Sequence, residues 1–109
     1  MSKLQPASKQ EHLKIGDLEI DTGRHQAFCK SVPLDLTPKE YDLLVFLAKN
    51  KEFVFSREQL LEKVWGYDYA GDTRTVDVHI RWLRQKIETD PAQPRNLLTV
   101  RGAGYKLAG

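Results

Sequence analysis

Apolar and polar residues alternate in short runs from His12 to Leu36. The apolar positions are Leu13/Ile15, Leu18/Ile20, Ala27/Cys29 and Val32/Leu34/Leu36. Turn-forming residues separate these runs at Gly16-Asp17, Asp21-Thr22-Gly23 and Lys30-Ser31. A period of two predicts strands with one buried face, and Gly, Asp and Ser between the runs favour reversals. We therefore expect a small antiparallel meander of four strands.

Two helix starts follow the alternating segment. Thr37-Pro38-Lys39-Glu40 has the capping-box pattern with Pro at the first helical position, and the apolar residues after it cover more than one face. This first helix should therefore be the most buried helix of the domain. Ser56-Arg57-Glu58-Gln59 repeats the capping box, and Gly66 supplies a C-terminal stop, so a second helix is expected from Ser56 to about Trp65.

A third helix is expected over about residues 73–88, capped by Asp72 or Thr73. Its apolar residues recur at spacings of four, three and four, which predicts one buried stripe. That stripe is Val76, Ile80, Leu83 and Ile87. The opposite face carries Arg74, Val78, Arg81, Trp82 and Gln85. The third helix therefore combines an apolar inner face with a basic outer face.

The chain closes with a predicted β-hairpin. Strands are expected at 97–100 and 105–107 around Arg101-Gly102-Ala103-Gly104, where the glycines allow a tight reversal. The order of elements predicts an α+β fold over residues 12–108, a winged helix-turn-helix with an N-terminal four-stranded antiparallel sheet, three helices and a C-terminal hairpin wing. Residues 1–11 are polar without periodicity and are expected to be a flexible linker or tail.

Composition excludes several classes of protein. The 109 residues suit one domain, and Cys29 stands alone, so neither an intrachain disulfide nor a Cys/His zinc site is expected. No apolar run approaches the length of a membrane span, and no signal peptide is recognisable. Carboxylates such as Asp35 and Glu40 are explained by a strand end and a cap. We expect a cytoplasmic protein that is not an enzyme and has no cofactor, metal or membrane contact.

Charge is distributed unevenly along the chain. Residues 74–106 carry seven basic and three acidic side chains, a net charge of +4, whereas the remaining residues sum to −2. A basic helix followed by a hairpin with Arg at its turn suits duplex DNA, because the major groove admits one helix and the hairpin can follow the neighbouring minor groove. The competing interpretation is a solvated helix that binds nothing charged.

Five ordered motifs carry a resemblance to a known family. They are Leu36-Thr37-x-x-Glu40-x-x-Leu43-Leu44, Ser56-Arg57-x-x-Leu60, Val64-Trp65-Gly66, Arg74-Thr75-Val76-Asp77-Val78-His79-Ile80-Arg81-x-Leu83-Arg84-x-Lys86 and Thr99-Val100-Arg101-Gly102-x-Gly104-Tyr105. Over nearly all of His12 to Leu107 the sequence resembles the DNA-binding output domains of bacterial two-component response regulators of the OmpR/PhoB type. This resemblance implies sequence-specific binding to double-stranded promoter DNA.

The resemblance implies contacts along the third helix. The residues expected to touch phosphates or base edges are Arg74, Thr75, His79, Arg81 and Arg84. Arg can hold phosphate or guanine bidentately, and Thr75 near the helix N-terminus can donate to phosphate. Val78 faces outward and could read a thymine methyl. Trp65, before the third helix, is expected to be partly core and partly a candidate phosphate donor through its indole N–H. Asp77 is expected to pair with Arg81 one turn later.

The resemblance also assigns the hairpin. It implies that Arg101 enters the minor groove, where A·T-rich stretches concentrate negative potential. Contacts with backbone phosphates would position Arg101, and the residues expected to make them are Thr99, Gly102 and Tyr105. The competing interpretation is a surface hairpin in which Gly102 only permits the turn and Tyr105 belongs to the core; both could hold for Tyr105, with its ring buried and its hydroxyl at the surface.

Trp82 departs from the family pattern. Many relatives carry Arg at this position, where it is a candidate for reading guanine, and an indole cannot make that bidentate contact. Trp82 could stack on sugar and thymine-methyl surfaces, or fold back along the helix and contact a neighbouring protomer.

Residues 66–72 form a longer connection than a plain helix-turn-helix needs. The side chains expected to make contacts there are Tyr67, Asp68, Tyr69 and Asp72. In the resembled family the corresponding loop is associated with RNA polymerase, and the competing interpretation is a stabilising loop whose tyrosines pack inward.

The resemblance further implies a receiver domain in the full-length protein and direct-repeat DNA half-sites. A chain of this length has no room for a receiver domain beside the winged helix, so we expect either a fragment cut at the linker or a free-standing domain, monomeric when isolated. The alternative function is a winged-helix adaptor that binds protein and has little or no affinity for DNA.

Overall fold

The computed structural model describes residues 11–109, which fall into two compact units, one ending at Asp35 and one spanning Leu36–Gly109. The expected flexible segment 1–11 lies outside the described residues except for Glu11. The main-chain N–H of Glu11 donates to Thr22 Oγ1 at 2.6 Å, so this residue joins the first strand pair.

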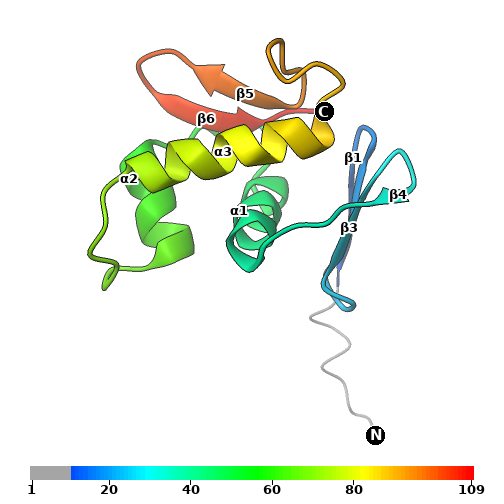
Figure 1. Cartoon of the computed structure of the whole chain (residues 1–109), viewed down its shortest axis with the longest axis horizontal. Helices are drawn as coiled ribbons and strands as arrows, with labels where there is room; N and C mark the ends of the chain where they lie inside the picture. The colour runs from blue at the N-terminus through cyan, green and yellow to red at the C-terminus, as the bar shows by residue number, and fades with distance from the viewer. Residues whose placement is uncertain (1–10) are drawn as a thin grey trace, which may run out of the picture. The chain divides into compact units, whose positions relative to one another are not determined.

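The first unit is a four-stranded antiparallel sheet in the order β1-β2-β3-β4, as expected (Figure 1). The strands are β1 (His12–Ile15), β2 (Leu18–Asp21), β3 (Gln26–Cys29) and β4 (Val32–Pro33). Ile20 lies opposite Ala27, and both side chains are buried on one face. β4 is shorter than the run to Leu36 predicted, although the N–H of Leu34 still donates to the carbonyl of Ala27 at 2.8 Å.

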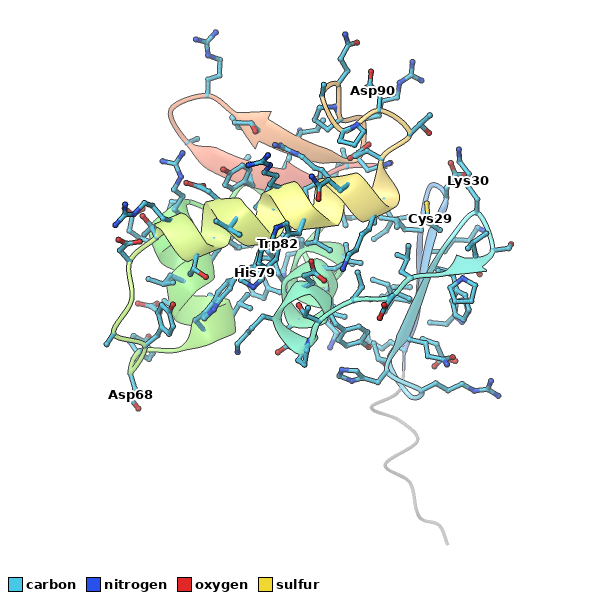
Figure 2. The ribbon with its side chains drawn as sticks, in the orientation of Figure 1. Cys29, Lys30, Asp68, His79, Trp82 and Asp90 are labelled. Carbon is cyan, nitrogen blue, oxygen red and sulfur yellow. The ribbon has the colours of Figure 1, made fainter. Side chains whose placement is uncertain are left out.

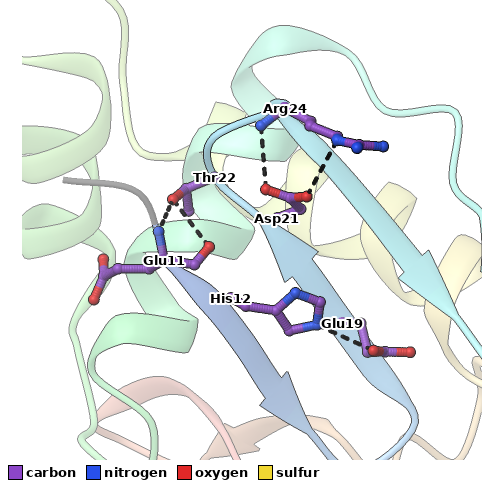
Figure 3. Close-up of polar contacts among 6 residues, drawn as sticks. All are labelled: Glu11, His12, Glu19, Asp21, Thr22 and Arg24. Atoms are coloured by element: carbon purple, nitrogen blue, oxygen red, sulfur yellow. Dashed lines mark hydrogen bonds and ion pairs between the residues drawn. The ribbon is translucent and has the colours of Figure 1, made fainter. Parts of the chain in front are cut away.

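Short polar contacts close the turns of this sheet. The Lys30-Ser31 reversal has positive φ at both residues, 52° and 67°, which matches the right-handed twist of the flanking strands. Figure 3 shows Asp21 accepting from the main-chain N–H of Arg24 at 3.2 Å, and the ring of His12 bonded to Glu19 at 3.1 Å. The first contact lies in the turn between β2 and β3, and the second joins β1 to β2.

In the second unit the first two helices begin where their caps predict. α1 (Pro38–Lys49) has Thr37 as its N-cap and a complete capping box with Glu40. α2 (Arg57–Leu60) has Ser56 as its N-cap and a capping box with Gln59. The chain then widens into a single π-helical stretch, η2 (Leu61–Trp65), which ends at Gly66 with φ of 102°. The sequence predicts this end but not the wider turn that leads to it.

α3 (Arg74–Ile87) presents the predicted inner stripe, and all four of its apolar residues are buried. Its N-terminus is capped by Asp72, whose Oδ1 accepts from the N–H of Arg74 at 2.9 Å, whereas Thr73 makes no side-chain cap. α1 packs against α3 and η2, and the fully buried Leu43, Leu44 and Leu47 place α1 at the centre of this unit.

The C-terminal hairpin consists of β5 (Leu97–Val100) and β6 (Gly104–Leu107), and we call it with its turn at 101–103 the wing. A third segment joins it, because Phe55 and Tyr105 exchange two main-chain hydrogen bonds of 2.9 Å and Glu52 donates to Leu107. Gly104 permits this pairing, since a Cβ there would collide with the carbonyl of Phe55. The structure thus confirms the predicted α+β fold with three helices, sheet and wing.

Within residues 11–109, no helix has the length and hydropathy that crossing a bilayer requires.

Candidate nucleic-acid interface

The outer face of α3 holds most of the side chains that the sequence assigns to DNA. Val78 and Trp82 lie one turn apart and are 40% and 41% exposed, and Arg74 and Arg81 are exposed as well. Figure 2 shows His79 and Trp82 beside one another on this helix. Polar and apolar groups therefore alternate along a surface that no other described element covers completely.

Arg74 is exposed but already has an acidic partner. Its Nε and one terminal nitrogen donate to Oδ2 of Asp72 at 3.0 and 2.8 Å. These hydrogen bonds hold the pKa of the Asp72 carboxyl below its ordinary value and raise the pKa of Arg74. Asp72 was expected to contribute to a contact surface of the loop at 66–72. In the structure it instead neutralises the charge of Arg74 at the start of α3.

Arg81 and Arg84 have different surroundings although both were expected to touch DNA. Arg84 is directed to the wing, where its Nε donates to the carbonyl of Leu97 at 2.9 Å and a terminal nitrogen donates to Thr99 Oγ1 at 2.7 Å. Its guanidinium also lies over the ring of Tyr105. Arg81 is exposed and makes no polar contact with another described residue. Arg84 therefore holds helix and wing together, whereas Arg81 is available to an anion.

The expected pairing of Asp77 with Arg81 is wrong. Asp77 Oδ1 accepts from Arg57 Nε at 2.7 Å and from the hydroxyl of Tyr105 at 2.6 Å. Burial raises the pKa of Tyr105 and the bond to Asp77 raises it further, while the same carboxylate raises the pKa of Arg57. Both partners come from other elements. These tertiary contacts replace the expected ion pair with Arg81, one turn away on the same helix. Tyr105 has its ring buried and its hydroxyl committed to Asp77.

An aromatic row crosses from the end of η2 to the middle of α3. The ring of His79 lies 4.9 Å from Trp65 and 5.0 Å from Trp82, between centroids, and Trp65 lies 6.4 Å from Tyr69. His79 Nδ1 is 2.7 Å from the carbonyl of Thr75, a spacing that suits an N–H donated by the ring. His79 is thus fixed in orientation by its own helix and by two indoles.

The wing turn presents an unengaged cation. Arg101 is exposed and makes no ion pair or hydrogen bond to another residue of the described chain. Gly102 has φ of 77° and open space around the position of a Cβ, so its role is the backbone conformation. Thr99 is exposed on β5, and its hydroxyl accepts from Arg84.

Two carboxylates that the sequence did not assign to the interface fix its geometry. Glu40 is 1% exposed and accepts from Lys86 Nζ at 2.6 Å, which ties the end of α3 to α1. Burial alone would raise the pKa of Glu40, but bonds from Lys86 and Thr37 outweigh it and lower that pKa overall. Glu88 accepts from the main-chain N–H groups of Arg95, Asn96 and Leu97. It therefore holds the start of β5 close to the C-terminal end of α3.

The connection between η2 and α3 is exposed on one side and packed on the other. Tyr67 is 83% exposed. Asp68 lies at the outer tip of the loop and points away from the helices (Figure 2). Tyr69 packs on Gly71, where a Cβ would collide with its ring. Lys39 from α1 donates to the carbonyl of Val64 at 3.0 Å and lies over the ring of Trp65. One tyrosine therefore packs and the other projects outward.

Comparison with known proteins agrees with this architecture. Residues 31–107 match the family model described as "Transcriptional regulatory protein, C terminal". The DNA-binding response regulator MtrA of Mycolicibacterium smegmatis is 52% identical over 96 residues, which cover 88% of this chain and 42% of MtrA. The chain thus spans less than half the length of this relative.

Solved structures give the same result. The response regulator DrrB, an OmpR/PhoB homologue of Thermotoga maritima, superposes with a TM-score of 0.83 at 39% identity, covering 90% of this chain and 44% of DrrB. The RstA DNA-binding domain of Klebsiella pneumoniae, crystallised with the RstA box, gives a TM-score of 0.80 at 32% identity and covers 90% and 97% of the two chains. This chain therefore belongs to the family of C-terminal domains of transcriptional regulatory proteins, of the OmpR/PhoB type.

Proposed function

We propose that this chain binds double-stranded DNA sequence-specifically, as the output domain of a two-component response regulator. The observation that carries the proposal is the position of two unengaged arginines in one unit. Arg81 lies on the outer face of α3, and Arg101 lies at the turn of a wing that Arg84 fastens to the same helix. The RstA domain, which has this fold, was crystallised with its DNA box.

In this proposal α3, with its flanking residues 73 and 88, occupies the major groove. Arg81 reaches phosphate or a base edge, and Arg74 does so after exchanging Asp72 for a phosphate. Thr75, Val78, His79 and Trp82 lie along the same face, with Trp65 behind His79. Arg84 contributes mainly by positioning the wing, because its donors are already occupied by Leu97 and Thr99.

The wing places Arg101 in the minor groove beside the bound helix. A short, exposed turn with one cation suits a narrow A·T-rich groove, where the negative potential is strongest. Gly102 supplies the backbone conformation of the turn, and Thr99 and Tyr105 hold its base through Arg84 and Asp77.

The loop at 66–72 serves as a contact for RNA polymerase in this proposal. Tyr67 and Asp68 supply the exposed surface, and Tyr69 and Asp72 hold the loop through Gly71 and Arg74. The further partners are a receiver domain in the full-length protein and direct-repeat half-sites in promoter DNA. The isolated chain is monomeric and works in the cytoplasm.

Selection of bound duplexes from a random library tests this function whatever the operator sequence is. Enrichment of a shared sequence with thymine- and guanine-containing positions over about one helical turn is expected for a single domain. Recovery of unenriched DNA, or of none, would contradict sequence-specific binding and favour the protein-binding adaptor.

A further inference from the structure

Trp82 occupies the outer face of α3 with 41% of its surface exposed. Val78 lies one turn before it on the same face and is 40% exposed. Arg81 is the neighbouring residue in the chain and makes no polar contact within the described residues. An apolar strip therefore runs along the centre of the face that the proposed function places in the major groove, with an available cation beside it.

The indole of Trp82 is supported from behind. Its ring lies 5.0 Å from His79 at an interplanar angle of 58°, and His79 lies 4.9 Å from Trp65 at 79°. The bond between His79 Nδ1 and the carbonyl of Thr75 fixes the middle ring. Because three rings support one another, placing the indole against a ligand costs less side-chain entropy than placing an isolated tryptophan would.

The chemistry of an indole restricts what it can read. It has one N–H donor and a large apolar surface, so it cannot make the paired hydrogen bonds by which Arg recognises guanine. The major-groove edge of a base pair presents a methyl group only at thymine C5. Burying that methyl against an aromatic ring is favourable, whereas cytosine presents only hydrogen at C5 and adds a polar amino group beside it.

We propose that Trp82 is a specificity-determining residue that selects thymine by contact with its C5 methyl group. This inference rests on the proposed DNA-binding function and adds the base that one side chain reads. It also assigns Trp65 and His79 a positioning role, because they orient the indole.

The test uses the duplex that this chain itself selects from the random library. Each thymine of the selected site is replaced singly by deoxyuridine, which removes the C5 methyl and leaves base pairing unchanged. At one position the loss of methyl burial should weaken binding by the wild-type chain about threefold to fivefold.

Two matched variants assign that loss to a side chain. Trp82→Ala should bind more weakly and should no longer distinguish thymine from deoxyuridine at that position, whereas Val78→Ala should retain the distinction. A third variant, Trp82→Arg, should shift the preferred base at the same position towards guanine. Because the side chains of Trp82 and Val78 are both partly exposed, all three variants should keep the circular dichroism spectrum and melting temperature of a folded domain.

Several results would overturn the inference while leaving DNA binding intact. They are a selected site in which no thymine is sensitive to deoxyuridine, a sensitivity that persists in Trp82→Ala, or one that disappears only in Val78→Ala. A chain that dimerises on DNA through Trp82 would show a concentration-dependent stoichiometry that Trp82→Ala abolishes, and this would also overturn it. Failure to bind any duplex would instead contradict the proposed function itself.

Discussion

Arg84 Nε donates to the main-chain carbonyl of Leu97 at 2.9 Å, which joins the third helix to the first strand of the wing. A second bond to Thr99 and the contact with the ring of Tyr105 strengthen this junction. Arg84, which the family resemblance assigns to DNA contact, therefore helps to fix the wing against the helix.

This junction distinguishes Arg84 from Arg81. Arg84→Ala should lower the free energy of unfolding by about 1–3 kcal/mol, because two hydrogen bonds are lost and one of the two acceptors, the carbonyl of Leu97, is partly buried. Arg81→Ala should change stability by no more than about 0.5 kcal/mol, since its side chain is exposed and unpaired. Urea denaturation of both variants measures the difference. Equal stability of the two would show that the Arg84 contacts contribute nothing to the fold.

Arg101→Ala should weaken binding most at sites with an A·T-rich minor groove beside the major-groove contact. The expected cause is loss of a cation from the narrow groove, where the potential is strongest. Binding of the variant to the selected site and to versions with G·C pairs in that flank measures the effect. The same loss at every flank would mean that Arg101 touches only phosphate.

Asp72→Asn should strengthen DNA binding by about twofold to fivefold at low salt, the order expected for removing an exposed ion pair. The substitution frees Arg74 and removes a negative charge, while the amide oxygen can still cap α3 by accepting from the N–H of Arg74. Asp72→Ala serves as a comparison, because it also removes the cap. Weaker binding by Asp72→Asn would show that the pair positions Arg74 for DNA instead of masking it.

Acid should destabilise the second unit through Glu40. The pKa of this carboxyl is lowered in the folded chain below its ordinary value of 4.5, so its contribution is complete above about pH 4.5 and is lost as the pH falls through the folded pKa. Glu40→Gln should cost about 1–3 kcal/mol at pH 7, and the difference from wild type should shrink towards acid. A difference that stays constant between pH 7 and pH 3 would contradict this assignment.

Local sequence signals predicted the elements well. Thr37 and Ser56 start their helices because capping boxes act within four residues, and Gly66 ends one because of its positive φ. The spacing of apolar residues predicted the buried stripe of α3, because the helical repeat places residues three or four positions apart on one face.

Contacts between distant residues were not predictable in this way. Asp77 bonds Arg57 and Tyr105, which are 20 and 28 positions away, and Phe55 extends the wing by pairing with Tyr105. The family resemblance implied that Arg84 touches DNA, but in the structure its guanidinium donates to Leu97 and Thr99 of the wing. Which cations remain available depends on the tertiary fold.

The salt dependence of binding to the selected half-site tests the central claim most directly. For wild type the logarithm of the association constant should fall linearly with the logarithm of salt concentration, and Arg81→Gln should reduce the slope by about 0.9, the value for one phosphate contact. Arg24→Gln removes the same charge from an exposed turn of the sheet and should leave the slope unchanged. Binding that is indifferent to salt, or equal slopes for wild type and Arg81→Gln, would contradict the claim that this helix face holds DNA.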